Sequence, residues 1–412
     1  MSHTEAPPAT SAPPPRQVIA ARTAVAFVFA LNGLAVASWF ARVPAAREGL
    51  GLSAGRLGLL LLAMSFGAIL AMLTAGAVVH RVGSPRTAGA STMLITAGLV
   101  VVGLGIGAWS SVPVVAVGLA AIGYGSGLTD VAMNVEAALV ERRLRRTIMP
   151  RFHAAWSLGT VSGAGLGAGS AQVGVPVFAH LTVVGAVVLA GTLLAVRSFL
   201  SARPGGATDD LSADGGTAHG NGVLRAWREP RTLLVGLLVL IMAFTEGTAN
   251  DWVAVAFVDG HGIGEAAGAA VFGIFVAAMT VGRTVGTVAL DRWGRIPVLF
   301  GTIGLAVAGV AVAVLAPSAP VAIAGVALWG LGASLGFPVG MSAAADDPDR
   351  APARVSVVAT IGYTAFLAGP PVVGLLGDQV GTLRALLIVP ILLAPALALV
   401  PAARPPAGHE AR

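Results

Sequence analysis

The sequence predicts an all-α membrane protein with twelve transmembrane helices in two similar halves, and three observations lead to this fold class. Of the 412 residues, 56% are hydrophobic and only 11% are charged, with a mean hydropathy of +0.85. A soluble domain carries roughly 25% charged residues. The apolar residues fall into twelve segments, each close to the ~20 residues that span about 30 Å of hydrocarbon. A loop motif also occurs twice, about half the chain apart.

The twelve segments divide evenly between the two halves of the chain. The first six cover 20–41, 56–79, 87–108, 112–137, 152–172 and 176–197. The other six cover 231–257, 267–290, 296–316, 319–343, 354–376 and 381–402. Only Gln172–Pro176 interrupts the apolar stretch from 152 to 197, so we expect a tight turn there.

These segments define the expected domains. We predict an N-terminal six-helix half over 18–198 and a C-terminal six-helix half over 231–403. Residues 1–17 are rich in Pro, Ala, Ser and Thr, and are expected to form a disordered tail. Residues 199–230 contain a run of Gly, Asp and other small or polar residues, typical of a flexible linker. Residues 404–412 form a second tail.

The placement of arginine predicts the orientation in the membrane. All 25 cationic residues are Arg, and twenty of them fall in alternate loops and tails, against four in the remaining loops. Because cytoplasmic loops carry an excess of basic residues, both termini and the linker are expected in the cytoplasm. The expected location is therefore the cell (inner or plasma) membrane, with multiple passes. This placement explains the net charge of +6 without a nucleic-acid partner.

The two loops of the repeated motif align at an offset of 211 residues, which places Arg81 on Arg292 and Gly83 on Gly294. A second match has an offset of 207 residues. It places Gly118, Gly123, Gly125 and Leu128 on Gly325, Gly330, Gly332 and Leu335. Two related halves built of membrane-length segments are typical of secondary transporters.

The repeated loop resembles the signature Gly-x-x-x-Asp-Arg-x-Gly-Arg-Arg of the major facilitator superfamily. Gly76, Arg81 and Gly83 fit this signature in the first half, and Asp291–Arg295 fits it in the second. Four further stretches are similar to the MosC/YbjJ-like bacterial subgroup, which lies near the fucose-type proton symporters: Ala41–Pro44, Asp130–Val135, Phe152–Ser157 and Ala368–Pro371. The resemblance covers about residues 20–402. It implies the major facilitator fold and points to a sugar- or polyol-like substrate.

The resemblance also implies that the repeated loops control a cytoplasmic gate. The expected gating residues are His80, Arg81, Gly83, Asp291, Arg292, Gly294 and Arg295. In the family, the residue at the position of His80 is an Asp that caps a helix of the opposite half. His80 would weaken this gate or make it sensitive to pH; alternatively, it is a solvated loop residue.

Charged side chains inside the bilayer cost roughly 2.5–3.5 kcal/mol each on insertion scales, so those present are candidates for function. Asp130 shares one helix face with Gly123, Gly127 and Asn134. A face of small and polar residues would line an aqueous cavity, where Asp130 and Asn134 would bind substrate and Asp130 would carry a proton. The alternative is a structural cap or a helix–helix hydrogen bond.

Glu246 and Asn250 lie one helical turn apart on the seventh segment, and Asn250 is a further candidate for substrate binding. Burial favours the protonated form of a carboxyl group, so Glu246 is the first candidate for proton coupling, against a buried structural hydrogen bond. Asp251 is expected at the outer surface or at the helix end. Arg283 lies roughly 24 Å from the outer face by the 1.5 Å rise per residue, at a depth similar to Asp130. It either pairs with Asp130 across the halves as an inner gate or extends toward the headgroups.

The fifth segment begins with a polar and aromatic face that includes His153 and Trp156. An aromatic ring suits the apolar face of a sugar, although Trp is also enriched at membrane interfaces. Asn32 and Trp39 on the first segment and Tyr363 on the eleventh are weaker candidates for substrate binding.

Two acidic residues near the inner surface have a simpler explanation. Glu136 and Glu141 are expected to pair with the arginine cluster over 142–146.

Together these features predict a secondary active transporter that moves a small solute by alternating access. Proton coupling is favoured over ATP, because the nucleotide-binding loop Gly-x-x-x-x-Gly-Lys cannot occur in a chain without Lys. Two alternatives remain: a proton-driven exporter of hydrophobic or cationic compounds, and a non-transporting membrane sensor with the same fold. We expect no enzymatic activity, no cofactor and no metal site, with thiolate sites excluded by the absence of Cys. The expected partners are a small molecule, protons and the lipid bilayer, and the expected state is a monomer.

Overall fold

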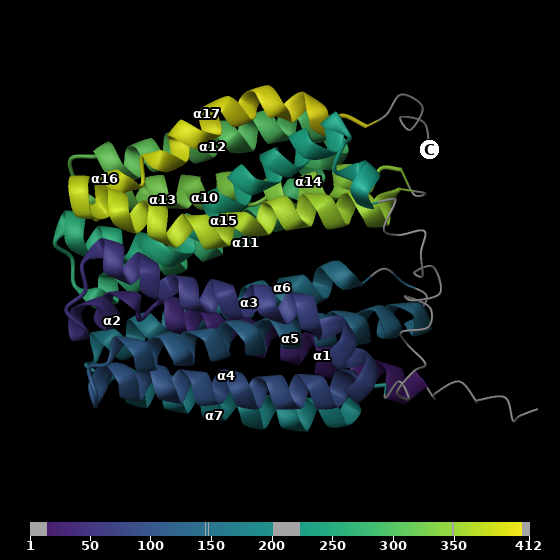
Figure 1. Ribbon diagram of the computed structural model, residues 1–412, viewed down its shortest axis with the longest axis horizontal. Coiled ribbons are helices and arrows are strands. Elements are labelled where there is room, and N and C mark those ends of the chain that lie inside the picture. Colours follow the sequence, from purple (N-terminus) through teal and green to yellow (C-terminus); the bar gives the residue numbers. More distant parts are fainter. Residues whose placement is uncertain (1–14, 145, 147, 201–222, 348–349, 406–412) are drawn as a thin grey trace, which may run out of the picture.

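Long α-helices run side by side through the computed structural model, which describes residues 15–144, 146, 148–200, 223–347 and 350–405 (Figure 1). The predicted tails and linker lie largely outside these residues. The first helix already begins at Pro15, within the predicted N-terminal tail.

The described helices form two groups of six membrane-length passes, as the sequence predicts. The N-terminal half contains α1 (Pro15–Phe40), α2 (Val43–Gly49), α3 (Ala54–Val82), α4 (Ser84–Gly107), α5 (Val112–Leu144), α6 (Met149–Gln172), α7 (Val177–Ala195) and η1 (Val196–Ser198). The C-terminal half contains α10 (Pro230–His261), α11 (Glu265–Trp293), α12 (Arg295–Leu315), α13 (Ala319–Ala333), α14 (Gly336–Ala344), α15 (Ala351–Val380), α16 (Thr382–Ala385), α17 (Ile388–Leu399) and η2 (Val400–Ala403). In each half, a pass that is broken or extended by a short helix counts once.

Eleven helical stretches among the described residues are long and apolar enough to cross a membrane. The helix α6 has 24 residues but is not among them. Its sequence carries Arg151, His153 and many Gly and Ser residues. It nevertheless packs against both α1 and α11, and so is one of the six passes of the N-terminal half.

The repeated loop has the same backbone conformation in both halves. Gly83 separates α3 from α4 with φ +86°, and Gly294 separates α11 from α12 with φ +75°. Both amides donate to the carbonyl four residues earlier, Val79 and Leu290. A positive φ strains any residue with a Cβ, which explains the glycine in both loops.

The second set of repeated glycines makes equivalent helix crossings in the two halves. An added Cβ on Gly123 would collide with the carbonyl oxygen of Met64, and one on Gly330 with that of Phe275. Met64 and Phe275 are themselves related by the 211-residue offset of the repeated loop. Two further glycine–carbonyl contacts repeat between the halves. Gly125 packs against the carbonyl of Ser91 as Gly332 packs against that of Thr302. Gly118 packs against the carbonyl of Gly98 as Gly325 packs against that of Gly309. The sequence repeat is therefore a repeat of helix packing.

Two predicted segments are not continuous helices. The tenth pass breaks between α13 and α14 at Ser334 and Leu335, although the sequence predicted one helix over 319–343. The twelfth pass divides into α16, α17 and η2. The short helix α2 was not predicted, because seven residues are too few to show a clear apolar period.

The two halves contact each other most closely at one end of the bundle. The start of α1 and the end of η2 lie at one end of the bundle, which we call the terminal end (Figure 1). The opposite end carries α2 and α16, and we call it the distal end. At the distal end, Arg47 pairs with Asp259, and Ser53 Oγ lies 3.1 Å from Asp378 Oδ2. An added Cβ on Gly374 would lie 2.5 Å from the Ala54 carbonyl oxygen, so α3 and α15 are in backbone contact there.

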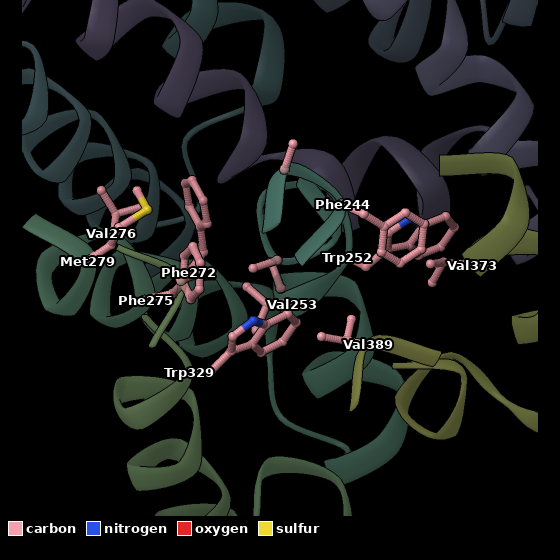
Figure 2. Close-up of a cluster of buried hydrophobic side chains, with 14 of the residues drawn as sticks. Phe244, Trp252, Val253, Phe272, Phe275, Val276, Met279, Trp329, Val373 and Val389 are labelled. Carbon is pink, nitrogen blue, oxygen red and sulfur yellow. The ribbon is translucent and has the colours of Figure 1, made fainter. Parts of the chain in front are cut away.

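The helix α10 lies at the centre of the C-terminal half, with 72% of its most apolar stretch buried. Figure 2 shows Trp252 of α10 beside Phe244 and near Val373 and Val389. Trp252 has no exposed surface. This packing fixes the rotation of α10 about its own axis, and so fixes which of its residues face the other half.

Candidate functional site

A cavity of about 220 Å³ lies between the two halves, near mid-bundle. Four helices supply its walls: α1, α3, α10 and α15. The lining residues are Phe40, Leu61, Met64, Ser65, Ala68, Ile69, Met72, Gly247, Asn250, Asp251, Tyr363 and Phe366. Both halves therefore contribute to one site, and most of its wall is apolar or aromatic.

One face of α10 points into this cavity. Gly247, Asn250 and Asp251 are spaced three and four residues apart, which places them on one side of a helix. The next residue, Trp252, is turned into the core of the C-terminal half. The burial of Trp252 thus holds Asp251 toward the cavity.

Asp251 lines the cavity, and its predicted position at the outer surface was wrong. The predicted segment ended at residue 257, but α10 continues to His261, so Asp251 lies ten residues before the helix end. Within the part of the chain that the structure describes, no hydrogen bond or ion pair to its carboxylate is formed. The polar neighbours that share the cavity are Asn250, Ser65 and Tyr363.

Asn250 and Tyr363, two of the predicted substrate-binding residues, also line the cavity. The Tyr363 ring is 6.3 Å from that of Phe366 and 6.1 Å from that of Phe337, measured between centroids. Tyr363 also lies within electrostatic range of Asp130 in the opposite half. The phenol group of Tyr363 therefore lines the cavity and is close enough to Asp130 to interact with it electrostatically.

Asp130 and Asn134 form a small polar unit on α5. The Asn134 amide nitrogen donates to the Asp130 carbonyl at 2.9 Å and to its carboxylate Oδ1 at 3.2 Å. Both side chains are partly buried, and the residues on the same face, Gly123 and Gly127, pack against α3. The face of small residues is therefore a packing surface between α5 and α3, while Asp130 is held by a neutral amide.

Glu246 pairs with Arg283 inside the C-terminal half. One terminal guanidinium nitrogen lies 3.0 Å from Glu246 Oε1 and 2.9 Å from Oε2. The Arg283 Nε lies 3.4 Å from the Ser334 carbonyl oxygen, at the break between α13 and α14. Neither predicted arrangement of Arg283 is found, because its guanidinium pairs with Glu246 of the same half and not with Asp130 or the headgroups.

His153 and Trp156 lie on α6, the less apolar pass. The His153 ring meets Phe29 edge-on at 5.3 Å, and His153 is within electrostatic range of Arg283 across the halves. Trp156 is partly buried, and its carbonyl oxygen lies where a Cβ on Gly33 would be, so α1 and α6 are in close contact. Neither residue lines the cavity described above.

Asn32 and Trp39 are buried within the N-terminal half, at 4% and 0% exposure. The Asn32 Oδ1 accepts a hydrogen bond from Ser126 Oγ on α5 at 3.2 Å. In this conformation both residues hold helices together and are not exposed to the cavity.

Glu136 and Glu141 form no ion pair with the described arginines of the cluster, and Arg145 lies outside the described residues. Glu136 accepts a hydrogen bond from the Leu200 amide. Glu141 Oε2 accepts hydrogen bonds from the Ile148 and Met149 amides, each at 2.7 Å. These carboxylates satisfy free backbone donors, which at the start of α6 also complements the helix dipole.

The predicted gating residues lie at the terminal end. Arg295 pairs with Asp346 at 2.6 Å, and Asp346 also pairs with Arg231 at 2.7 Å, so this network joins α10, α12 and the end of α14 within one half. His80, Arg81, Asp291 and Arg292 are exposed, and the Arg292 guanidinium carbon lies 6.0 Å from the Trp293 ring centroid.

A second network at the terminal end joins the starts of α10 and α15. Glu229 accepts hydrogen bonds from Arg354 at 2.6 Å and from Thr232 at 3.0 Å. Partial burial raises the pKa of Glu229, but these hydrogen bonds and the charges of Arg354 and Arg350 outweigh that effect and hold the pKa below its usual value. Glu229 is therefore a charged cap before α10.

Among the described residues, no group of three or more His, Cys, Asp and Glu side chains is arranged to hold a metal ion.

Known proteins share both the sequence and the fold of this chain. The model of the Major Facilitator Superfamily matches residues 25–363. An uncharacterized transporter of Sinorhizobium fredii, y4wD, is 30% identical over 88% of this chain and 93% of its own length. The membrane protein MosC of Rhizobium meliloti is 30% identical over 89% of this chain and 86% of its own length. The resemblance to the MosC-like subgroup is confirmed.

Solved structures share the arrangement of helices. A mutant of the nucleoside transporter NupG superposes with a TM-score of 0.78 at 11% identity, over 93% of this chain and 99% of that one. A mutant of the E. coli fucose:proton symporter FucP gives a TM-score of 0.64 at 16% identity, over 94% and 100% of the two chains. At these identities the likeness shows the fold. With the family match over most of its length, the chain belongs to the major facilitator superfamily and is a multi-pass membrane transporter, not an enzyme.

Proposed function

We propose that this protein is a proton-coupled carrier that moves a small solute across the cell membrane by alternating access. The observation that carries this proposal is the cavity between the two pseudo-symmetric halves, lined by α10 and α15 from one half and by α1 and α3 from the other. In carriers of this architecture the solute binds at the interface of the repeats, and rocking of one half against the other exposes it to each side in turn.

The proposed orientation follows from the arginine bias, which assigns the terminal end to the cytoplasm. Closure at the distal end by the Arg47–Asp259 pair and by the contact of α3 with α15 then corresponds to an inward-facing state. In the opposite state, the repeated loops around Gly83 and Gly294 would approach each other and close the cytoplasmic side.

Asp130 is the proposed proton carrier. Its carboxylate is held by the neutral amide of Asn134, so protonation breaks no ion pair. Glu246 is bound by Arg283, and protonation of Glu246 would leave the guanidinium without its partner. Glu246 therefore takes part in coupling only in a state in which Arg283 has moved, for example toward Asp130.

The solute proposed from the family likeness is sugar- or polyol-like. The aromatic side chains of Phe40, Tyr363 and Phe366 suit the apolar face of a ring, and Asn250 and Ser65 supply hydrogen-bonding groups. The same apolar wall also suits a hydrophobic or cationic compound, which keeps an exporter as the second candidate.

The test is proton flux in proteoliposomes that enclose a pH-sensitive dye, with sugars, polyols and amphipathic cations added in turn. Acidification of the lumen on addition of one solute identifies proton symport. Asp130→Asn should abolish this flux and retain solute binding, whereas the matched control Asp347→Asn, at the terminal end, should retain both. Alkalinisation by a cation would replace the symporter with an exporter, and binding without flux in a gradient of either sign would replace it with a sensor.

A further inference from the structure

The carboxylates near the central cavity are unequally neutralised. Glu246 is paired with Arg283 through both of its oxygens. The carboxylate of Asp251, only five residues further along α10, forms no ion pair with any described residue. The cavity wall therefore holds one carboxyl group without a basic partner, in a part of the bundle where an unpaired charge is costly.

The surroundings of Asp251 are those of a site for an organic cation. Phe40, Tyr363 and Phe366 line the same cavity, from α1 and α15. Aromatic faces attract ammonium groups through their ring quadrupoles, and this attraction strengthens when water is excluded. A carboxylate with aromatic neighbours therefore binds a protonated amine through two independent interactions.

A neutral solute would bind this cavity poorly. It would displace water from the carboxylate of Asp251 without supplying a counter-charge, and so incur the desolvation cost of a buried charge. A cationic solute supplies that counter-charge itself. Asp251 is therefore a selectivity element, because its desolvation disfavours the binding of neutral analogues while its charge favours the binding of cations.

We propose that Asp251 anchors the protonated amine of the transported solute, whose apolar body lies against Phe40, Tyr363 and Phe366. This inference rests on the proposed transport function and, of the two solute classes named there, favours a cationic compound over a neutral sugar or polyol. It also separates two roles: Asp251 in the C-terminal half binds the cation, and Asp130 in the N-terminal half carries the proton. Tyr363 lines the cavity that holds Asp251 and also lies within electrostatic range of Asp130.

The test compares amines with neutral molecules of the same shape. Purified full-length protein in detergent is titrated with cyclohexylamine against cyclohexanol and with glucosamine against glucose. Affinities are read from the concentration dependence of the melting temperature, because a ligand that binds only the folded state stabilises it by mass action. The variants are Asp251→Asn, which removes the charge, Asp251→Glu, which retains it, and the control Asp347→Asn at the terminal end.

The proposal expects at least one amine to bind more tightly than its neutral partner. This preference should fall by about tenfold or more in Asp251→Asn, the loss typical of one charged hydrogen bond, and should persist in Asp251→Glu and in the control Asp347→Asn. A preference for amines that survives in Asp251→Asn overturns the proposal. So does the absence of any preference for the amine of each pair in the wild-type protein.

Failure of this inference is distinguishable from failure of the transport function. Proton flux driven by a neutral sugar, with no response to the amines, would retain the carrier and overturn the cation site. Amine binding that depends on Asp251, without flux of any solute, would support the cation site and overturn the carrier.

Discussion

The Glu246–Arg283 ion pair is a structural contact whose strength can be measured. The two side chains are 15% and 29% exposed, so each charge is largely removed from water. We expect Glu246→Gln and Arg283→Gln each to lower the free energy of unfolding by roughly 2 kcal/mol, less than the 3–5 kcal/mol of a fully buried pair. Thermal unfolding of the single and double variants in detergent measures this.

The double variant Glu246→Gln/Arg283→Gln provides the control. Because it removes both charges, it should be more stable than either single variant. Additive losses in the double variant would mean that the two residues act independently, and that the pair is not the contact that stabilises the centre of the C-terminal half.

At the scale of single residues, the sequence identified the charged residues inside the bundle more reliably than it identified their interaction partners. The cost of a charge in lipid identified Glu246, Asp130 and Arg283, but depth alone could not choose between two acidic partners for the arginine. Asp251 was misplaced because the helix end was predicted four residues too early. A signal for it was present in the sequence: the apolar run Trp252–Val258 follows Asp251 directly, so the residue lies inside the apolar segment and not at its end.

At the scale of elements, the two loop glycines, Gly83 and Gly294, should respond equally to substitution by alanine. Gly83→Ala and Gly294→Ala should each destabilise the protein by about 1–2 kcal/mol, because both positions have a positive φ that Ala adopts only with strain. The control is Gly76→Ala on α3, where no heavy atom lies within 4 Å of an added Cβ. That substitution should be neutral or stabilising, since Ala favours the helix.

The melting temperatures of the three variants measure these changes in stability. Equal losses of stability in Gly83→Ala and Gly294→Ala, with no loss in Gly76→Ala, would show that the two loops contribute equally to stability as well as sharing one backbone conformation. A loss in only one loop would show that the other tolerates a changed backbone.

The elements themselves were largely predictable from the sequence. Runs of apolar residues of membrane length define the passes, and the repeated glycines define which helices cross. The break at Ser334 was not predictable in this way, because the residues on both sides of it are apolar or small. Its role becomes clear only in three dimensions, where the Ser334 carbonyl oxygen lies 3.4 Å from Arg283 Nε.

At the scale of the whole molecule, the closed distal end distinguishes this state from its alternate. Arg47 of α2 pairs with Asp259 of α10, and Thr382 of α16 donates to the same carboxylate at 2.5 Å. Phe40 and Phe272 also meet across the halves, with ring centroids 6.0 Å apart. An outward-facing state must break these contacts, so weakening them should shift the population toward it.

A single cysteine can report this shift, because the chain has none of its own. We expect Ser65→Cys, in the cavity wall, to react with a membrane-impermeant maleimide faster from the cytoplasmic side than from the outside. Adding Arg47→Ala should raise labelling from the outside about two- to fivefold, since a partly exposed ion pair contributes up to about 1 kcal/mol. Asp259→Ala should act in the same direction.

The matched control is Arg56→Ala, which removes an exposed arginine from the same end of the bundle. It changes the local charge and leaves the Arg47–Asp259 pair intact, so it should leave the labelling rate of Ser65→Cys unchanged. Equal effects of Arg56→Ala and Arg47→Ala would attribute the shift to the positive charge of the outer surface and not to the contact between the halves. Faster labelling from the outside before any substitution would reverse the assignment of the two ends, because the terminal end, and not the distal end, would then be the closed one.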